Sequence, residues 1–185
     1  MLRTAGSSVA LSALGLPLFS ETKNRQSLST NEKRIILVVG AHPDDPETGC
    51  GGTIILLSRA GHEVVSLYLT RGEAGIKGKK YEEAAQIRTA EALKACKIMG
   101  ARAEFLSQID GSCEITPERY AEMHDFIRKE NPDIVLTHWP IDGHRDHRIC
   151  SVLVYDAWLK MNRSFELYYY EVESGQQTQL FAPTD

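Results

Sequence analysis

Short apolar runs alternate with longer amphipathic segments along this chain. The first run, 35–39, is unbroken, rich in β-branched residues and too short for a helix, which is typical of a strand buried on both faces of a parallel sheet. Comparable runs predict four further strands, over 63–70, 103–106, 133–137 and 165–172. Helical periodicity and helix-start and helix-stop residues predict helices between them, over 45–59, 81–99, 117–129 and 150–161. Strands alternating with helices predict an α/β fold, a Rossmann-like three-layer fold with a mainly parallel sheet.

The N-terminal segment has a different composition. Arg3 precedes an uncharged run of small and apolar residues, 5–19, which is typical of the apolar region of a secretory signal; an apolar, disordered N-terminus is the alternative. Residues 21–33 are polar and rich in Ser, Thr and Asn, as expected of a linker. We therefore expect an export signal over 1–20, a linker over 21–33 and one domain over 34–185. This organisation predicts a periplasmic or extracellular protein without a stable membrane anchor.

Composition excludes some classes of partner. The 185 residues suffice for one domain with a full core, and 42% hydrophobic with 25% charged residues is ordinary for a globular protein. The net charge of −4 and the lack of a basic run argue against nucleic acid as the partner. Four cysteines form no C-x-x-C pair, which argues against a structural zinc knuckle and defines no disulfide framework: Cys50, Cys96, Cys113 and Cys150.

A histidine and two aspartates directly follow the first strand. His42, Asp44 and Asp45 come after the apolar run ends at Gly40, and ligand sites of open α/β sheets lie past the carboxyl ends of the strands. Helix capping by Asp45 before Pro46 is the simpler alternative, but it leaves the histidine and the other aspartate unexplained. A dinucleotide fingerprint starting at Gly40 would need glycines at 42 and 45, so a nucleotide-binding module is disfavoured.

A second polar cluster, 138–147, follows the fourth predicted strand and should lie at the same edge of the sheet. A hydrolytic zinc site needs three nitrogen or oxygen ligands and an open position for water. His42 and Asp45 could supply two ligands from one tight turn, and His147 the third. Asp44 would then be free to act as general base on the activated water.

Two more residues of the second cluster are candidates for the chemistry. His144 could polarise the scissile carbonyl or protonate the leaving amine, and the Asp146 carboxylate could hold its imidazole by a hydrogen bond. For one such loop alone, solvent-facing histidines at a helix start are the simpler interpretation. Two loops on one edge of a sheet favour a site.

These motifs resemble a known family. Ala-His-Pro-Asp-Asp at 41–45 with Glu47, and His-Arg-Asp-His at 144–147, look like the two signatures of the LmbE/PIG-L zinc-dependent N-deacetylases. Three weaker matches agree with this resemblance, which spans about 33–181: the loop 70–75, the Arg88-Thr-Ala-Glu91 segment and the Asp110-Gly111 turn.

The resemblance implies hydrolysis of an N-acetyl group on a GlcNAc-containing small molecule or glycan, leaving acetate and a free amine. It implies zinc, with iron as the alternative metal, held by His42, Asp45 and His147. The family's base falls on Asp44 and its electrophilic or acidic histidine on His144. Its sugar-contacting arginine falls on Arg88, and the matching loop and turn make Arg71 and Asp110 further substrate-binding candidates. Family members usually continue well past the final strand, so this chain looks C-terminally truncated; its oligomeric state stays open.

Two other functions remain alternatives at this point. The same activated water could serve a metal-dependent esterase or another amidase. A non-catalytic metal- or sugar-binding domain is the other alternative, but a site that only holds a metal does not need Asp44 beside Asp45. For Arg88 the alternative to sugar binding is a surface salt bridge to Glu91, which is worth only a few tenths of a kcal/mol.

Overall fold

The computed structural model describes residues 32–172. The expected export signal, nearly all of the expected linker and the polar C-terminal tail lie outside these residues. Within them, five strands alternate with four helices in chain order: β1 (Ile35–Gly40), α1 (Asp45–Arg59), β2 (Glu63–Tyr68), α2 (Tyr81–Met99), β3 (Arg102–Phe105), α3 (Pro117–Glu130), β4 (Ile134–His138), α4 (Arg145–Lys160) and β5 (Glu166–Tyr170). This confirms the predicted alternation.

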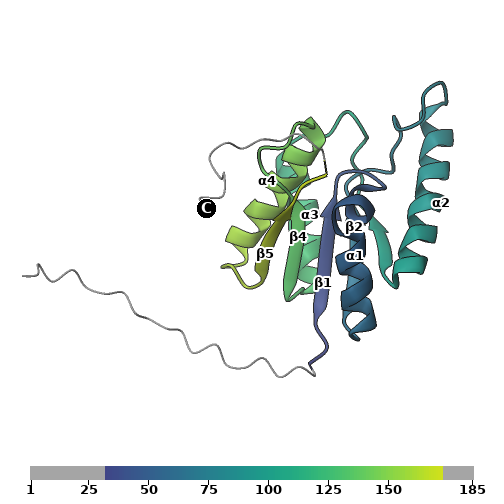
Figure 1. Cartoon of the computed structure of the whole chain (residues 1–185). Helices are drawn as coiled ribbons and strands as arrows, with labels where there is room; N and C mark the ends of the chain where they lie inside the picture. The colour runs from purple at the N-terminus through teal and green to yellow at the C-terminus, as the bar shows by residue number, and fades with distance from the viewer. Residues whose placement is uncertain (1–31, 173–185) are drawn as a thin grey trace, which may run out of the picture. The chain divides into compact units, whose positions relative to one another are not determined.

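The five strands form one sheet in the order β3-β2-β1-β4-β5, and every neighbouring pair is parallel. Figure 1 shows β1 at the centre of the sheet, between β2 and β4. The strand order reverses direction at β1, because β2 and β3 lie to one side of it and β4 and β5 to the other. In such sheets the ligand site lies beyond the carboxyl ends of the strands at this switch point.

Each face of the sheet has its own core, which makes the fold three-layered. Alternate residues of β1 point to opposite faces, so Leu37 and Val39 pack with α3 and α4, whereas Ile36 and Val38 pack with α1 and α2. All four side chains are completely buried. The unbroken apolar run at 35–39 is therefore explained by helices on both faces, as a parallel sheet requires.

Two helix starts differ from the sequence-based expectation. Asp44, not Asp45, is the N-cap of α1, so Asp45 is the first helical residue and its side chain turns inward. The last helix begins at Arg145 rather than at residue 150, because His144 caps it: its Nδ1 accepts the Asp146 backbone N–H at 3.2 Å. The second signature is thus folded into a cap and a first helical turn rather than into a loop.

Close packing brings the start of α1 against the end of β1. A Cβ atom on Gly40 would lie 2.6 Å from Pro46 Cδ and 2.8 Å from Asp45 Cβ, so only glycine fits there. This contact fixes where the turn between β1 and α1 can run, and with it the first signature. Among the described residues, no helix has the length and apolarity needed to cross a bilayer.

Candidate metal centre

The His42 ring lies among carboxylates from three separate segments. Its Nδ1 is 3.3 Å from Asp45 Oδ2, and its Nε2 is 3.2 Å from Asp146 Oδ2 and 3.3 Å from Asp110 Oδ1. Asp110 follows β3 and Asp146 belongs to the first turn of α4. Segments far apart in the sequence therefore meet at one imidazole, at the carboxyl edge of the sheet.

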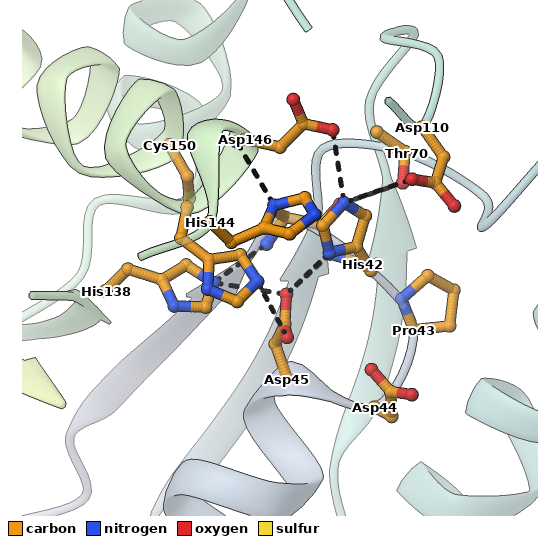
Figure 2. Close-up of polar contacts among 12 residues, drawn as sticks. His42, Pro43, Asp44, Asp45, Thr70, Asp110, His138, His144, Asp146 and Cys150 are labelled. Atoms are coloured by element: carbon orange, nitrogen blue, oxygen red, sulfur yellow. Dashed lines mark hydrogen bonds and ion pairs between the residues drawn. The ribbon is translucent and has the colours of Figure 1, made fainter. Parts of the chain in front are cut away.

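Asp45 is the centre of the cluster. It is only 2% exposed. Its Oδ2 accepts the His42 backbone N–H at 2.7 Å and lies 3.1 Å from His138 Nε2, while its Oδ1 is 3.3 Å from His147 Nε2. Figure 2 shows the Asp45 carboxylate pointing in among the histidine rings. The three residues predicted as metal ligands are thus side by side.

The cluster concentrates negative charge around its imidazoles. Burial opposes a charge on His42, but hydrogen bonds to Asp110, Asp146 and Asp45 outweigh it and raise the pKa of this histidine to about 11. Burial likewise acts to raise the pKa of Asp45, but its contacts with His138, His147 and His42 hold that pKa well below its usual range. Buried carboxylates that stabilise the protonated His42 imidazole in this way would also stabilise a bound cation.

His138 belongs to the cluster although the sequence analysis gave it no role. It is fully buried at the last position of β4, and its ring stacks on that of His147 with 3.8 Å between centroids. Its Nε2 is also 3.1 Å from the Ala41 backbone nitrogen, which donates to it. Its place at the carboxyl end of a strand, inside the second polar cluster, was the signal that could have identified it.

Asp142 is a second residue that the sequence analysis did not single out. Its Oδ1 accepts the His144 backbone N–H at 2.7 Å and lies 3.1 Å from His147 Nδ1. It therefore connects the cap of α4 with one of the predicted ligands. Carboxylates in this position orient a ligating histidine in metal sites.

The predicted contact between the Asp146 carboxylate and His144 has a different form. The carboxylate lies against His42 and accepts the Gly111 backbone N–H at 2.8 Å, while it is the Asp146 backbone that binds His144. The reason is the helical conformation of Asp146, which turns its side chain toward β1 and its N–H toward the cap. Contacts to His42 and Gly111 outweigh desolvation and lower the pKa of Asp146 to about 2.

Asp44 lies apart from the rings, beyond Pro43 (Figure 2). Its side chain is 60% exposed, and it forms an ion pair with Arg88. The Arg88 Nη2 atom also donates to the Pro43 carbonyl, and Nη1 donates to Glu91 at 2.6 Å. The salt bridge to Glu91, which was the alternative to sugar binding, is therefore present. The same guanidinium also binds two residues of the first signature.

A hollow of about 440 Å³ opens beside the cluster. It is lined by the turn after β1, the loop after β2, helix α2, the turn after β3 and the N-cap of α4: His42, Asp44, Gly72, Ala74, Gly75, Arg88, Asp110, Gly111 and His144. Three predicted functional groups thus face one space, namely the candidate base, the candidate acid and the candidate sugar-binding arginine.

Arg71 lines different hollows, of about 370 and 270 Å³, together with residues of α2 such as Glu82. The loop 71–75 separates them from the hollow beside His42, since Gly72 and Ala74 line one side and Arg71 and Glu73 the other. Glu73 and Asp110 fix this wall: Glu73 Oε2 accepts the Asp110 N–H at 3.1 Å and Asp110 Oδ2 accepts the Ala74 N–H at 3.2 Å.

The chemistry of the cluster fits a transition-metal ion. Three groups of residues each offer ligand atoms that lie within 4.8 Å of one another, and the predicted ligands His42, Asp45 and His147 are divided among these groups: His42, His144 and His147; Asp45, His138 and His147; His42, Asp110 and Asp146. Imidazole nitrogen and carboxylate oxygen are the ligands that zinc and iron take in hydrolytic and oxidative sites. The buried negative charge around these nitrogens supplies the matching electrostatics.

The fold is an open parallel α/β sheet with a cluster of histidines and aspartates at its switch point. Comparison with known proteins identifies the family to which the chain belongs. The family model described as GlcNAc-PI de-N-acetylase (PIG-L) matches residues 37–158. The chain belongs to this family. Diacetylchitobiose deacetylase from Thermococcus kodakarensis is 36% identical over 133 residues, covering 69% of this chain and 50% of that protein.

Two further matches bear on the fold and on the range of chemistry. The structure of N,N′-diacetylchitobiose deacetylase from Pyrococcus horikoshii, complexed with the inhibitor MPG, superposes with a TM-score of 0.65 at 29% identity, covering 69% of this chain and 50% of that chain. A relative from Pseudomonas putida, 28% identical over 143 residues (73% of this chain, 55% of that protein), is named 4-oxalmesaconate hydratase. The chain spans about half the length of these relatives.

Proposed function

We propose that this protein is a metal-dependent N-deacetylase that removes the acetyl group from a GlcNAc-containing substrate by hydrolysis. The observation that carries the proposal is the convergence of His42, Asp45 and His147 beside a hollow that Asp44, His144 and Arg88 also face. Membership of the family and the deacetylase names of the relatives support the same reaction.

His42, Asp45 and His147 would hold the ion, zinc or iron. When bound, such an ion supplies Lewis acidity, which makes water acidic enough to lose a proton near neutral pH and polarises a carbonyl. The buried carboxylates behind His42, from Asp110 and Asp146, would fix the ring orientation and increase its basicity as a ligand.

Asp44 would take the proton from the attacking water. Its carboxylate is at the rim of the hollow, next to the ligand Asp45 but with its own side chain outside the ligand cluster. Arg88 keeps it in place through the ion pair and through the Pro43 carbonyl. A base that faces the hollow and is held by a cation stays oriented toward its proton donor, which general-base catalysis requires.

His144 would act on the leaving group. It caps α4 and lines the same hollow as Arg88, and its ring centroid is 4.8 Å from that of His42. The other ring nitrogen, Nε2, would protonate the amine or polarise the acetyl carbonyl, since Nδ1 accepts the Asp146 N–H. In this role it completes the acid–base pair with Asp44.

The sugar would bind in the same hollow. Nη2 of Arg88 binds Asp44 and Pro43, so the guanidinium would offer its remaining donors to a sugar hydroxyl, and the Asp110 carboxylate offers acceptors. Arg71 would contribute only to a part of the substrate that extends past the loop 71–75.

Release of amine from GlcNAc and from N,N′-diacetylchitobiose tests this proposal, with the metal content of the purified protein measured in parallel. We expect about one zinc or iron per chain, loss of activity on treatment with a chelator, and recovery on adding the metal back. Acetylated sugar left intact by the metal-loaded protein would reject the proposal.

Addition of water to a double bond is a second candidate, because one relative is named a hydratase. The same base and activated water would serve it, but a hydratase forms no amine or acetate. Acetate release from an acetamido sugar therefore separates the two functions in one assay.

A further inference from the structure

The backbone of Asp44 has an unusual conformation for a side chain that is proposed to do chemistry. Its φ is 108° and its ψ −20°, in the left-handed region that non-glycine residues rarely adopt. Such a conformation persists only where the surroundings impose it, and conformations of this kind are concentrated at functional sites. The contacts of this turn show what imposes it.

Glu47 holds the turn through both of its carboxylate oxygens. Oε2 accepts the Asp44 backbone N–H at 3.2 Å, and Oε1 accepts the Tyr68 hydroxyl at 2.6 Å. The Asp44 carbonyl in turn accepts the Thr48 N–H at 2.8 Å. The backbone on either side of the Asp44 Cα is therefore fixed, and from this position the Asp44 carboxylate lines the hollow and pairs with Arg88.

Tyr68 makes the position of Glu47 rigid. It is the last residue of β2, is completely buried, and stacks on Phe105 with 5.0 Å between ring centroids. Its hydroxyl is also 3.3 Å from Cys96 Sγ on α2, so the ring can neither tilt nor slide without losing contacts. Through this hydroxyl, β2 fixes the carboxylate of Glu47.

We propose that Glu47, fixed by the Tyr68 hydroxyl, is a positioning residue that orients Asp44 for proton transfer. The proposal rests on the proposed function of Asp44 as general base. A glutamate three residues after an N-cap is ordinarily a capping residue that stabilises the helix. Capping alone requires neither a buried tyrosine on the other carboxylate oxygen nor a left-handed N-cap, since N-cap residues are normally extended.

Two conservative substitutions separate positioning from capping. Tyr68→Phe keeps the ring and its stacking but removes the donor to Glu47. Glu47→Gln keeps the shape of the side chain but leaves one acceptor oxygen, whereas the hydrogen bonds from the Asp44 N–H and the Tyr68 hydroxyl need two. For each variant we expect kcat to fall on the order of 10- to 100-fold, the usual cost of displacing a reacting group by about 1 Å. KM and zinc content should not change.

The matched control is Tyr168→Phe. Tyr168 also donates to a glutamate at 2.6 Å, but this pair with Glu166 is exposed on β5. Loss of a tyrosine–glutamate hydrogen bond there should leave kcat unchanged. A fall in kcat for this control as large as for Tyr68→Phe would overturn the proposal.

The decisive experiment repeats Glu47→Gln in an Asp44→Asn background. If Glu47 acts through Asp44, the second substitution lowers kcat little further, because residues that act as a unit are not additive. Additive losses, or a lower Tm with unchanged kcat in Glu47→Gln alone, would overturn the positioning role and leave the deacetylase function intact. Full activity in Asp44→Asn alone would instead reject the proposed role of Asp44, and the positioning role with it.

Discussion

Asp44 and Asp45 are adjacent in the sequence but belong to two different regions of the molecule. Asp45 is 2% exposed and contacts three histidines, whereas the Asp44 side chain is 60% exposed and contacts an arginine. Their pKa values are shifted in opposite directions. Histidine contacts outweigh burial and lower the pKa of Asp45. Partial desolvation and the neighbouring Asp45 charge raise the pKa of Asp44 despite the opposing effect of Arg88. Two neighbouring carboxylates with opposite shifts are suited to different tasks.

The difference comes from the position at which helix α1 begins, which lies between these two residues. Because α1 begins at Asp45, this side chain turns into the sheet edge, and the N-cap Asp44 is left outside at the rim. The deep region, which comprises Asp45 and the histidines around it, is suited to hold a cation. The rim, which comprises Asp44 and Arg88, is suited to transfer protons and to bind substrate. The predictions below test this division of tasks.

The largest effect is expected in the deep region. His147→Ala should reduce turnover by about a thousandfold or more, because the Lewis acidity of the ion is worth several kcal/mol. Metal content should fall with it. His124→Ala, a substitution on α3 away from the cluster, is the matched control and should keep both. Activity that survives the loss of the metal would contradict the assignment.

A smaller but still large effect is expected at the rim. Asp44→Asn should lower kcat by roughly 10²–10⁴-fold, the range for losing a general base. Steady-state kinetics on an acetamido sugar provides the measurement. Retention of wild-type turnover would show that the rim carboxylate does not handle the proton.

His138 sharpens the description of the deep region. His138→Phe retains a ring that can stack on His147 but removes the nitrogen 3.1 Å from Asp45. We expect zinc affinity to fall about 10- to 100-fold, as for other residues that orient a metal ligand. A competition titration with a chromogenic chelator measures it, and unchanged affinity would make His138 a packing residue only.

The last effect, comparable in size to that expected at His138, concerns the arginine at the rim. Arg88→Ala should cost about 1.5–3 kcal/mol in kcat/KM, the range for hydrogen bonds to a charged group. Glu91→Ala removes only the exposed partner on the same helix and should cost about 0.5 kcal/mol or less. Equal costs for the two variants would reduce Arg88 to a surface salt bridge.

Much of this arrangement could be predicted from the sequence because it follows from periodicity. The apolar runs located all five strands, and parallel strands with polar residues at their carboxyl ends placed His42, Asp45 and His147 together. The family resemblance, now shown, assigned the same residues.

What could not be predicted depends on packing in three dimensions. The stacking of His138 on His147 depends on the distance between β4 and α4, which the spacing of residues along the sequence does not determine. Asp44 is left-handed in a turn whose Glu47 accepts a hydrogen bond from a tyrosine of β2, a contact that the sequence does not reveal. Arg71 and Gly72 are adjacent in the loop 71–75, yet they line different hollows, and the chain turns at Gly72, whose φ is 73°.

Zinc titration of Asp44→Asn and Asp45→Asn side by side, monitored by calorimetry, tests the division of tasks most directly. The two substitutions are chemically identical and one residue apart. We predict that Asp44→Asn binds one zinc per chain with wild-type affinity and that Asp45→Asn binds it at least about 100-fold more weakly, as expected when a ligand carboxylate is lost from a three-residue site. Equal zinc affinity in the two variants would contradict the account.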